Sequence, residues 1–491
     1  MRFRATTRKA QRMKNHMFAG KTAALHTLGC KVNEYETDSM RAALEDAGFS
    51  IVEFHQRADV YVINTCSVTN IADRKSRQML SRAKRDNPDA VVVAVGCYVQ
   101  TALDRTGKEV DADILIGSAR KKSLVEELEK YFAAMELSRR NVSDVMHEME
   151  YEDLSVPRIE SHTRAFVKVQ DGCSLFCSYC IIPFARGRIR SRKIEDVLEE
   201  VKTLALQGIR EVVLTGIHLS SYGVDFAGDI REAYGGNGEK ETWQDRSMLI
   251  DLIEAVSGID GIERIRLGSL EPTIITEESV SRLAKVRELC PHFHLSLQSG
   301  CDSVLKRMNR HYTTQEYLNG LELIRDAFHD PAITTDVIVG FPGESEEEFN
   351  CTMTFLEQAR LYETHLFRYS MRAGTKAARM TDQIPECVKE ERLSRLSALD
   401  RTMRKAFEDA WDGREAEVLF EEEARFDRNG SIVVPNSGGV IRDDGISAAL
   451  TDGKKLYTGY TREYIRVFSL SAEDLKGKIR TGRLDGRMIL V

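Results

Sequence analysis

The cysteine run at residues 173–180 limits the possible folds and functions of this chain more than any other feature. Cys173, Cys177 and Cys180 follow a strand-like segment, residues 165–169, in a C-x3-C-x2-C spacing. Three thiolates this close in sequence can bind one soft metal centre, and thiolates favour zinc or iron–sulfur clusters. A structural zinc normally takes its fourth ligand from a second Cys or His pair, and no pair of the type C-x2-C or H-x3-H occurs elsewhere in the sequence. The run therefore favours a [4Fe–4S] cluster with one open iron, and a zinc knuckle is the alternative.

Length and composition describe a soluble protein of several domains. The chain has 491 residues, which is more than one ordinary hydrophobic core accommodates. Hydrophobic residues make up 42% and charged residues 30%. No apolar run approaches the ~18 residues of a membrane helix, and the N-terminus lacks the apolar core of a secretory signal. We therefore expect a cytoplasmic protein with no membrane partner, in which ten cysteines favour metal binding or catalysis over disulfides.

Residues 1–20 are expected to form a basic N-terminal extension. Residues 1–21 hold seven Lys or Arg and no Asp or Glu, whereas the whole chain has a formal net charge of −7. An acidic chain does not coat nucleic acid by charge alone, but a basic arm can contact phosphates. A solvated tail, or an upstream extension of a protein that starts at Met17, is the alternative.

Residues 21–150 predict a doubly wound domain with its own metal site. Strand-like runs at 22–28, 58–64 and 90–95 alternate with helical patterns, which indicates βαβ units and a parallel sheet. One cysteine follows each of the three strands: Cys30, Cys66 and Cys97. Ligands bind at the carboxyl edge of such sheets, so we expect these thiols to converge on a second metal. Buried structural cysteines are the alternative.

Residues 160–390 contain six strand-like runs separated by helical patterns. The runs are residues 165–169, 211–215, 264–268, 292–297, 333–339 and 364–369. Six βα repeats predict a partial, TIM-like (β/α)6 barrel, whose active site lies at the carboxyl ends of its strands. Because Cys173 follows the first strand, motif and fold place the cluster at the same face.

A basic run follows the cluster loop directly. Guanidinium forks bind phosphates and carboxylates, so we expect this run to contact RNA or substrate, with plain surface charge as the alternative. The arginines of the run are Arg186, Arg188, Arg190 and Arg192.

Residues 400–471 predict a small β-barrel. Short alternating runs at 416–420, 431–434 and 464–467 are separated by turn signals, a pattern typical of such barrels. Small barrels are a common platform for nucleic acids. Residues 472–491 carry no clear signal and are expected to form a tail.

Several motifs resemble the radical S-adenosylmethionine (SAM) methylthiotransferases, in the domain order of that family. The C-x3-C-x2-C run is similar to the radical-SAM signature. Three segments of the first domain resemble the family as well: Thr27-Leu-Gly-Cys-Lys-Val-Asn-Glu-Tyr-Glu-Thr37, Asn64-Thr-Cys-Ser-Val-Thr69 and Val95-Gly-Cys97. The resemblance implies two [4Fe–4S] clusters. One cluster, bound by Cys173, Cys177 and Cys180, would chelate SAM and cleave it to a 5′-deoxyadenosyl radical. The auxiliary cluster, bound by Cys30, Cys66 and Cys97, would carry the sulfur that is transferred.

The resemblance implies further contacts. SAM is expected to touch the loops after the barrel strands, with plain turns and a structural carboxylate as the alternatives, at Gly216, Glu271, Ser296, Gln298 and Gly340. Segments 418–422 and 459–467 resemble the TRAM domain that holds tRNA, which implies RNA contacts at Arg462 and Arg466, beside Lys454 and Lys455. A reduced ferredoxin or flavodoxin is the expected electron donor, and a sulfur source is also required.

Within the family, segments 27–33, 176–183 and 214–223 most resemble one branch. That branch methylthiolates carbon 2 of N6-threonylcarbamoyladenosine beside the anticodon, so the anticodon stem-loop of tRNA is the expected partner. Sister branches act on N6-isopentenyladenosine or on an aspartate of a ribosomal protein. A radical-SAM enzyme whose first-domain cluster only transfers electrons, and a non-catalytic zinc and RNA-binding protein, are the alternatives from other classes.

Overall fold

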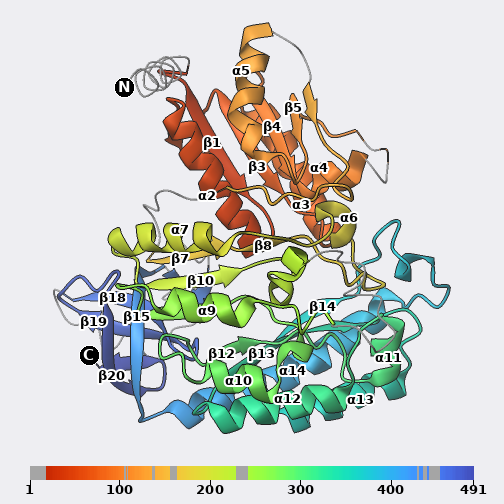
Figure 1. Ribbon diagram of the computed structural model, residues 1–491, viewed down its shortest axis with the longest axis vertical. Coiled ribbons are helices and arrows are strands. Elements are labelled where there is room, and N and C mark those ends of the chain that lie inside the picture. Colours follow the sequence, from red (N-terminus) through yellow and green to blue (C-terminus); the bar gives the residue numbers. More distant parts are fainter. Residues whose placement is uncertain are drawn as a thin grey trace.

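The computed structural model describes residues 18–103, 107, 109–134, 139–154, 163–227, 242–427, 431–434, 439–441 and 454–490. The predicted basic extension lies outside these residues up to position 17. Figure 1 shows the N-terminal region in red and orange above the central region in yellow and green. The C-terminal strands, in blue, lie beside the central strands β7 and β10. Among the described residues, no helix combines the length and the apolar character needed to cross a membrane.

The N-terminal region is a six-stranded parallel sheet with helices on both faces. Its order is β2-β1-β3-β4-β5-β6, and its strands are β1 (Thr22–Thr27), β2 (Ser50–Val52), β3 (Val60–Thr65), β4 (Val91–Gly96), β5 (Ile114–Ile116) and β6 (Arg139–Asn141). Alternation along β4 produces two cores. Val93 packs with α2 (Lys31–Asp46) and α5 (Leu124–Ala134). Val92 packs with α3 (Asn70–Asp86) and α4 (Cys97–Thr101). The predicted parallel α/β sheet is confirmed.

The central region contains the six predicted strands in parallel. They are β7 (Arg164–Lys168), β10 (Glu211–Thr215), β11 (Arg264–Leu267), β12 (His292–His294), β13 (Ala332–Val339) and β14 (Glu363–Arg368). The first three pair in one sheet and the last three in another. Bridges from Ile265 to Leu289 and from Leu270 to Leu295 connect the two sheets, so the strands follow one another in chain order.

Helices cover these strands and start at sequence signals that are easy to recognise. The helices of the central region are α6 (Ile182–Arg186), α7 (Ile194–Leu206), α9 (Leu249–Ser257), α10 (Glu277–Leu283), α11 (Asp302–Arg307), α12 (Thr314–Ala327), α13 (Glu346–Ala359) and α14 (Glu386–Trp411). Thr276, Thr313 and Ser345 form capping boxes at the starts of α10, α12 and α13. Each box satisfies backbone N–H groups that a helix start leaves unpaired.

The C-terminal region is a mostly antiparallel sheet whose pairings return to their first strand. From β15, pairings lead through β18, β19, β21 and β20 back to β15. The strands are β15 (Glu415–Phe426), β16 (Ile432–Val434), β17 (Gly439–Ile441), β18 (Lys455–Thr461), β19 (Arg466–Ser471), β20 (Ile479–Asp485) and β21 (Met488–Leu490). The prediction of a tail from residue 472 is therefore wrong. Ile489 of β21 packs in the core of this region. The charged residues of β20 made the alternating pattern of that strand hard to recognise in the sequence.

Glu211 on β10 connects the central region to the C-terminal region. Its carboxylate lies 2.8 Å from Nε of both Arg264 and Arg266. Both arginines in turn donate to the backbone carbonyl of Thr461. Burial alone would raise the pKa of Glu211, but Arg266, Arg264 and Arg164 lower it to about 2. The carboxylate therefore stays ionised inside the protein and holds the arginines that dock the C-terminal sheet.

The variant Glu211→Gln is expected to lose ~3 kcal/mol or more of stability at pH 7, because the buried arginines lose their counterion. A carboxyl with a folded pKa of about 2 and an ordinary value of 4.5 contributes stability fully above pH 4.5 and loses it as the pH falls toward 2. The difference between wild type and variant should therefore narrow in that window. Denaturant unfolding between pH 7 and pH 3 measures it, and a pH-independent difference contradicts the assignment.

Candidate functional site

The N-terminal trio, Cys30, Cys66 and Cys97, lies at the carboxyl edge of the first sheet. Cys30 caps the start of α2 directly after β1, Cys66 follows β3, and Cys97 starts α4 after β4. Gly29 passes so close to Cys66 that a Cβ there would lie 2.6 Å from its Sγ, and its φ of 104° also requires glycine. The sheet edge thus gathers the three strand-end cysteines, as their spacing predicts.

The thiols of this trio influence one another's ionisation. Burial, together with the charges of Cys97 and Cys30, raises the pKa of Cys66 to about 12. Burial likewise raises the pKa of Cys30, against the opposing charge of Arg186. Three thiolates can share this space only when a positive charge compensates them. Iron supplies that charge in a cluster.

The central trio, Cys173, Cys177 and Cys180, lies in the loop after β7 and the short strand β8 (Gln170–Asp171). Gly172 passes the backbone of Arg188 so closely that a Cβ there would lie 1.8 Å from the carbonyl oxygen. Burial, together with the neighbouring charge of Cys177, raises the pKa of Cys180 to about 12. This loop therefore also gathers three cysteines at the carboxyl end of a strand, with Cys177 buried and the other two half-buried.

Hydrogen-bond donors point at the sulfur atoms of the central trio. The backbone N–H of Ile182 donates to Sγ of Cys180 at 3.4 Å. Nη1 of Arg310 donates to Sγ of Cys177 at 3.3 Å, and its Nη2 lies 2.6 Å from Glu271. Donors of this kind stabilise thiolates rather than thiols.

The donor sets are compatible with iron–sulfur clusters. Among the described residues, no three His, Cys, Asp or Glu side chains form a set that would hold one metal ion. In a cubane cluster, each thiolate binds its own iron atom, so the sulfur atoms need not converge on one point. Two all-cysteine trios, one of them with donors to sulfur, are consistent with that ligand type.

The segments that carry the two trios touch each other. Helix α4, which starts at Cys97, contacts α6, which starts two residues after Cys180. Ser118 donates a hydrogen bond to the backbone carbonyl of Ala185 in α6. At the end of α6, Arg186 forms 2.6 and 2.7 Å contacts with Asn33 and Glu36 on α2. The two candidate metal centres therefore face a common domain boundary.

A buried ionic network fills this boundary. Glu36 lies 2.9 Å from Lys121 and 2.8 Å from Lys168, and Lys168 lies 2.6 Å from Asp171. All of these side chains, with that of Arg186, are buried. Burial would raise the pKa of Glu36, but Arg186, Lys121 and Lys168 hold it far below its usual value. The network keeps its charges because each one is paired.

The prediction that the basic run at residues 186–192 contacts RNA is wrong for three of its four arginines. Arg186, Arg190 and Arg192 are 1 to 3% exposed. Arg190 donates to the carbonyl of Arg186, and Arg192 pairs with Glu200. These guanidinium groups already have acidic or carbonyl partners inside the protein. Arg188 is half-buried, with its guanidinium 5.5 Å from the ring centre of Phe176.

The structure places the five predicted SAM contacts at strand ends. Glu271 is buried between Arg310 and His218, whose Nε2 lies 3.8 Å away. The carbonyl of Ser296 accepts from Tyr312 at 2.6 Å. Gln298 has a φ of 70° and Gly340 a φ of 69°, and Gly216 packs against Gln170. Glu271 and Ser296 share Arg310 with the central trio, whereas SAM contact at all five positions stays a prediction.

The predicted RNA contacts of the C-terminal region have partners inside the protein. Arg462 donates to the carbonyls of Arg287 and Leu289 at 2.6 and 2.9 Å. Nε of Arg466 donates to the hydroxyl of Tyr460 at 2.8 Å. Lys454 and Lys455 are exposed, and Lys455 pairs with Glu423 at 2.8 Å. Arg462 thus docks the C-terminal region on the central one, and RNA contact at these positions stays a prediction.

Arg310 and the boundary network were not foreseen from the sequence. Arg310 follows the additional helix α11 rather than a strand end, so the strand-end rule does not find it. Glu36 and Lys168 occupy ordinary positions within a predicted helix and a predicted strand. A charged residue inside an apolar strand is a weak signal of this kind, because such charges are rarely buried unless paired.

Sequence comparisons agree with this geometry. Residues 167–356 match the radical SAM superfamily, and residues 22–117 match an uncharacterized protein family named UPF0004. The chain is similar to the threonylcarbamoyladenosine tRNA methylthiotransferase MtaB of Bacillus subtilis, at 38% identity over 93% of this chain and 92% of that protein. The protein of the same name from Aquifex aeolicus is 39% identical over 82% and 93%. The tRNA-2-methylthio-N(6)-dimethylallyladenosine synthase of Acetivibrio thermocellus is 35% identical over 82% and 81%.

A solved structure shares the fold. The radical SAM methyltransferase TsrM of Kitasatospora setae matches 71% of this chain and 73% of its own, with a TM-score of 0.50 at 15% identity. That likeness concerns the fold alone, whereas the two family matches, residues 22–117 and 167–356, contain both cysteine trios. On these grounds the chain belongs to the radical SAM methylthiotransferases that modify tRNA.

Proposed function

We propose that this protein inserts a methylthio group at carbon 2 of N6-threonylcarbamoyladenosine, beside the anticodon of tRNA. The observation that carries the proposal is the meeting of two all-cysteine trios at one domain boundary, through the contact of α4 with α6. The relatives named for this nucleoside support the substrate. In this assignment the central strands form a partial (β/α)6 barrel, and the C-terminal sheet is a small TRAM-type barrel that holds the anticodon stem-loop.

Two [4Fe–4S] clusters and SAM are the proposed cofactors. Cys173, Cys177 and Cys180 would hold the cluster that binds SAM, and the N-terminal trio would hold the auxiliary cluster. The groups supply the electron, the radical and the sulfur for replacing an unreactive C–H bond. The residues of the chain would hold these groups in place. Arg310 donates to Cys177 and fixes Glu271. A reduced ferredoxin or flavodoxin and a sulfur donor would complete the cycle.

Nucleoside mass spectrometry on tRNA from cells with and without the protein tests the proposal. Loss of the protein is expected to remove 2-methylthio-N6-threonylcarbamoyladenosine and to let the unthiolated nucleoside accumulate. Loss of the methylthio group from the isopentenyl nucleoside instead would keep the enzyme class and overturn the substrate. Unchanged tRNA nucleosides would contradict a tRNA substrate and point to a protein substrate.

A further inference from the structure

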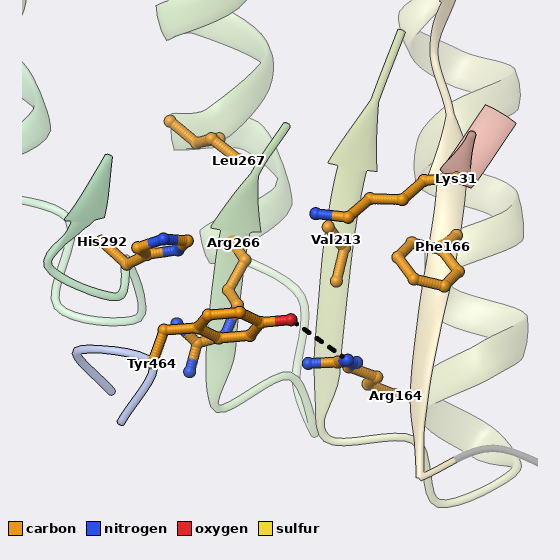
Figure 2. Close-up of a pocket in the computed structure, with 8 residues that line it drawn as sticks. All are labelled: Lys31, Arg164, Phe166, Val213, Arg266, Leu267, His292 and Tyr464. Atoms are coloured by element: carbon orange, nitrogen blue, oxygen red, sulfur yellow. Dashed lines mark hydrogen bonds between the residues drawn. The ribbon is translucent and has the colours of Figure 1, made fainter. Parts of the chain in front are cut away.

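A cationic recess inside the central region combines side chains from all three regions of the protein (Figure 2). It has ≈ 10 Å³ of free space, room for about one water-sized polar group. The lining residues are Lys31 from α2, Tyr464 from the C-terminal sheet, and Arg164, Phe166, Val213, Arg266, Leu267 and His292 from the central strands. Figure 2 shows the Lys31 ammonium, the Tyr464 hydroxyl and the Arg164 guanidinium around one common space.

The arginines of the recess are already paired, whereas Lys31 is not. Arg164 lies 3.2 Å from Glu421 and 3.4 Å from the hydroxyl of Tyr464. Arg266 lies 2.8 Å from Glu211. The side chain of Lys31 is exposed and lines the recess, and none of the hydrogen bonds or ion pairs among the described residues involves its ammonium group. A cation without a partner in a cationic recess is suited to bind an anion.

The wall of the recess is rigid and carries a second unused polar group. The ring of Tyr464 stacks on His292 at 4.7 Å and on Tyr460 at 4.5 Å. The backbone of Tyr464 has a φ of 70°, a left-handed conformation that residues other than glycine rarely adopt. His292 is 6% exposed, and its Nδ1 has no partner among the described residues. A buried ring nitrogen without a partner is costly unless a ligand satisfies it.

We propose that Lys31 determines specificity by binding the carboxylate of the threonylcarbamoyl group on the target adenosine, with one carboxylate oxygen in the recess and with His292 and Tyr464 forming the wall around that oxygen. This inference rests on the proposed function. The threonyl carboxylate is ionised at neutral pH, whereas an isopentenyl group has neither charge nor polar atoms. Lys31 directly follows Cys30, so the backbone that carries the lysine also carries a cysteine of the N-terminal trio. The subsite therefore accounts for a choice between two modified adenosines by charge.

The test uses the reconstituted holoenzyme and two anticodon stem-loop RNAs. One RNA carries N6-threonylcarbamoyladenosine, and the other carries the same group with its carboxylate converted to a neutral carboxamide. Wild type is expected to show a ~10- to 100-fold lower KM for the carboxylate RNA, the range of a charge-assisted hydrogen bond. Lys31→Gln should reduce that preference to about threefold or less, and Lys31→Arg should retain most of it. Iron and acid-labile sulfide content verify that the variants keep both clusters.

The outcomes separate this inference from the proposed function. Product from the carboxylate RNA, with equal KM values for the two RNAs in wild type, overturns the carboxylate subsite and leaves the function intact. A preference that Lys31→Gln retains in full assigns carboxylate binding to another residue and overturns the role of Lys31. Absence of product from the carboxylate RNA, with product from an isopentenyl RNA, overturns the proposed function itself. The wild-type comparison remains decisive if Lys31→Gln does not bind its clusters.

Discussion

Serine at Cys177 or at Cys66 is expected to abolish the methylthiolated nucleoside in tRNA. Each replacement removes one of the three thiolate ligands of a proposed cluster, and neither trio has another cysteine to take that place. We expect the product to fall below detection, a larger effect than any other single change discussed here. Each purified variant should also contain roughly half of the wild-type iron and acid-labile sulfide, because only one cluster is lost.

The two variants should differ in one measurable step. With Cys177→Ser, SAM is no longer cleaved, so 5′-deoxyadenosine should not form. With Cys66→Ser, the central trio is intact and some cleavage of SAM should continue without methylthiolation. Cys387→Ser is the matched control, because Cys387 is an exposed thiol on α14 and should not affect either readout. Full methylthiolation by Cys66→Ser would refute the two-cluster scheme.

The second large effect is expected from Glu36→Gln at the domain boundary. This change leaves Lys121, Lys168 and Arg186 buried with one carboxylate fewer. Unpaired buried charges of this kind cost ~3 to 5 kcal/mol. The N-terminal region should therefore separate from the central region, or unfold, at lower temperature or lower denaturant than in wild type.

Glu45→Gln is the matched control, because Glu45 lies exposed on the same helix, α2. Calorimetry with limited proteolysis at the boundary measures both variants. Equal unfolding profiles for Glu36→Gln and Glu45→Gln would show that the network does not hold the regions together. A loss confined to Glu36→Gln would support that role.

The sequence predicted the parts of the fold that follow a period or a strong local signal. Buried strands such as β4 and capped helices such as α12 appear at the predicted positions, because their apolar repeats and caps are local properties. The sequence patterns do not predict β2, β5 and β6, which are three residues long and show no period. Strand β20 was missed because its outward residues are charged.

The candidate site divides in the same way. The cysteine trios follow from strand ends, a rule that uses only the order of elements along the chain. The functions of the arginines cannot be predicted from the order of elements. The same residue type binds RNA on a protein surface and pairs with carboxylates in a protein interior. Arg186 meets Glu36 from a helix about 150 positions earlier in the chain, and no local pattern encodes that partnership. The proposed role of Lys31 likewise depends on Tyr464, a residue of the C-terminal region that lines the same recess.

One ion pair also constrains how such proteins can be recombined. Cys30 starts α2, and Glu36 lies on the same helix, whereas Arg186 ends the helix that begins just after Cys180. The contact between Glu36 and Arg186 therefore ties a ligand of one trio to a ligand of the other through two short, rigid segments. A chimera that exchanges the N-terminal region alone would keep three thiols in each region but would replace one partner of the contact between Glu36 and Arg186. Functional exchange between relatives should require α2 and α6 to be transferred as a matched set.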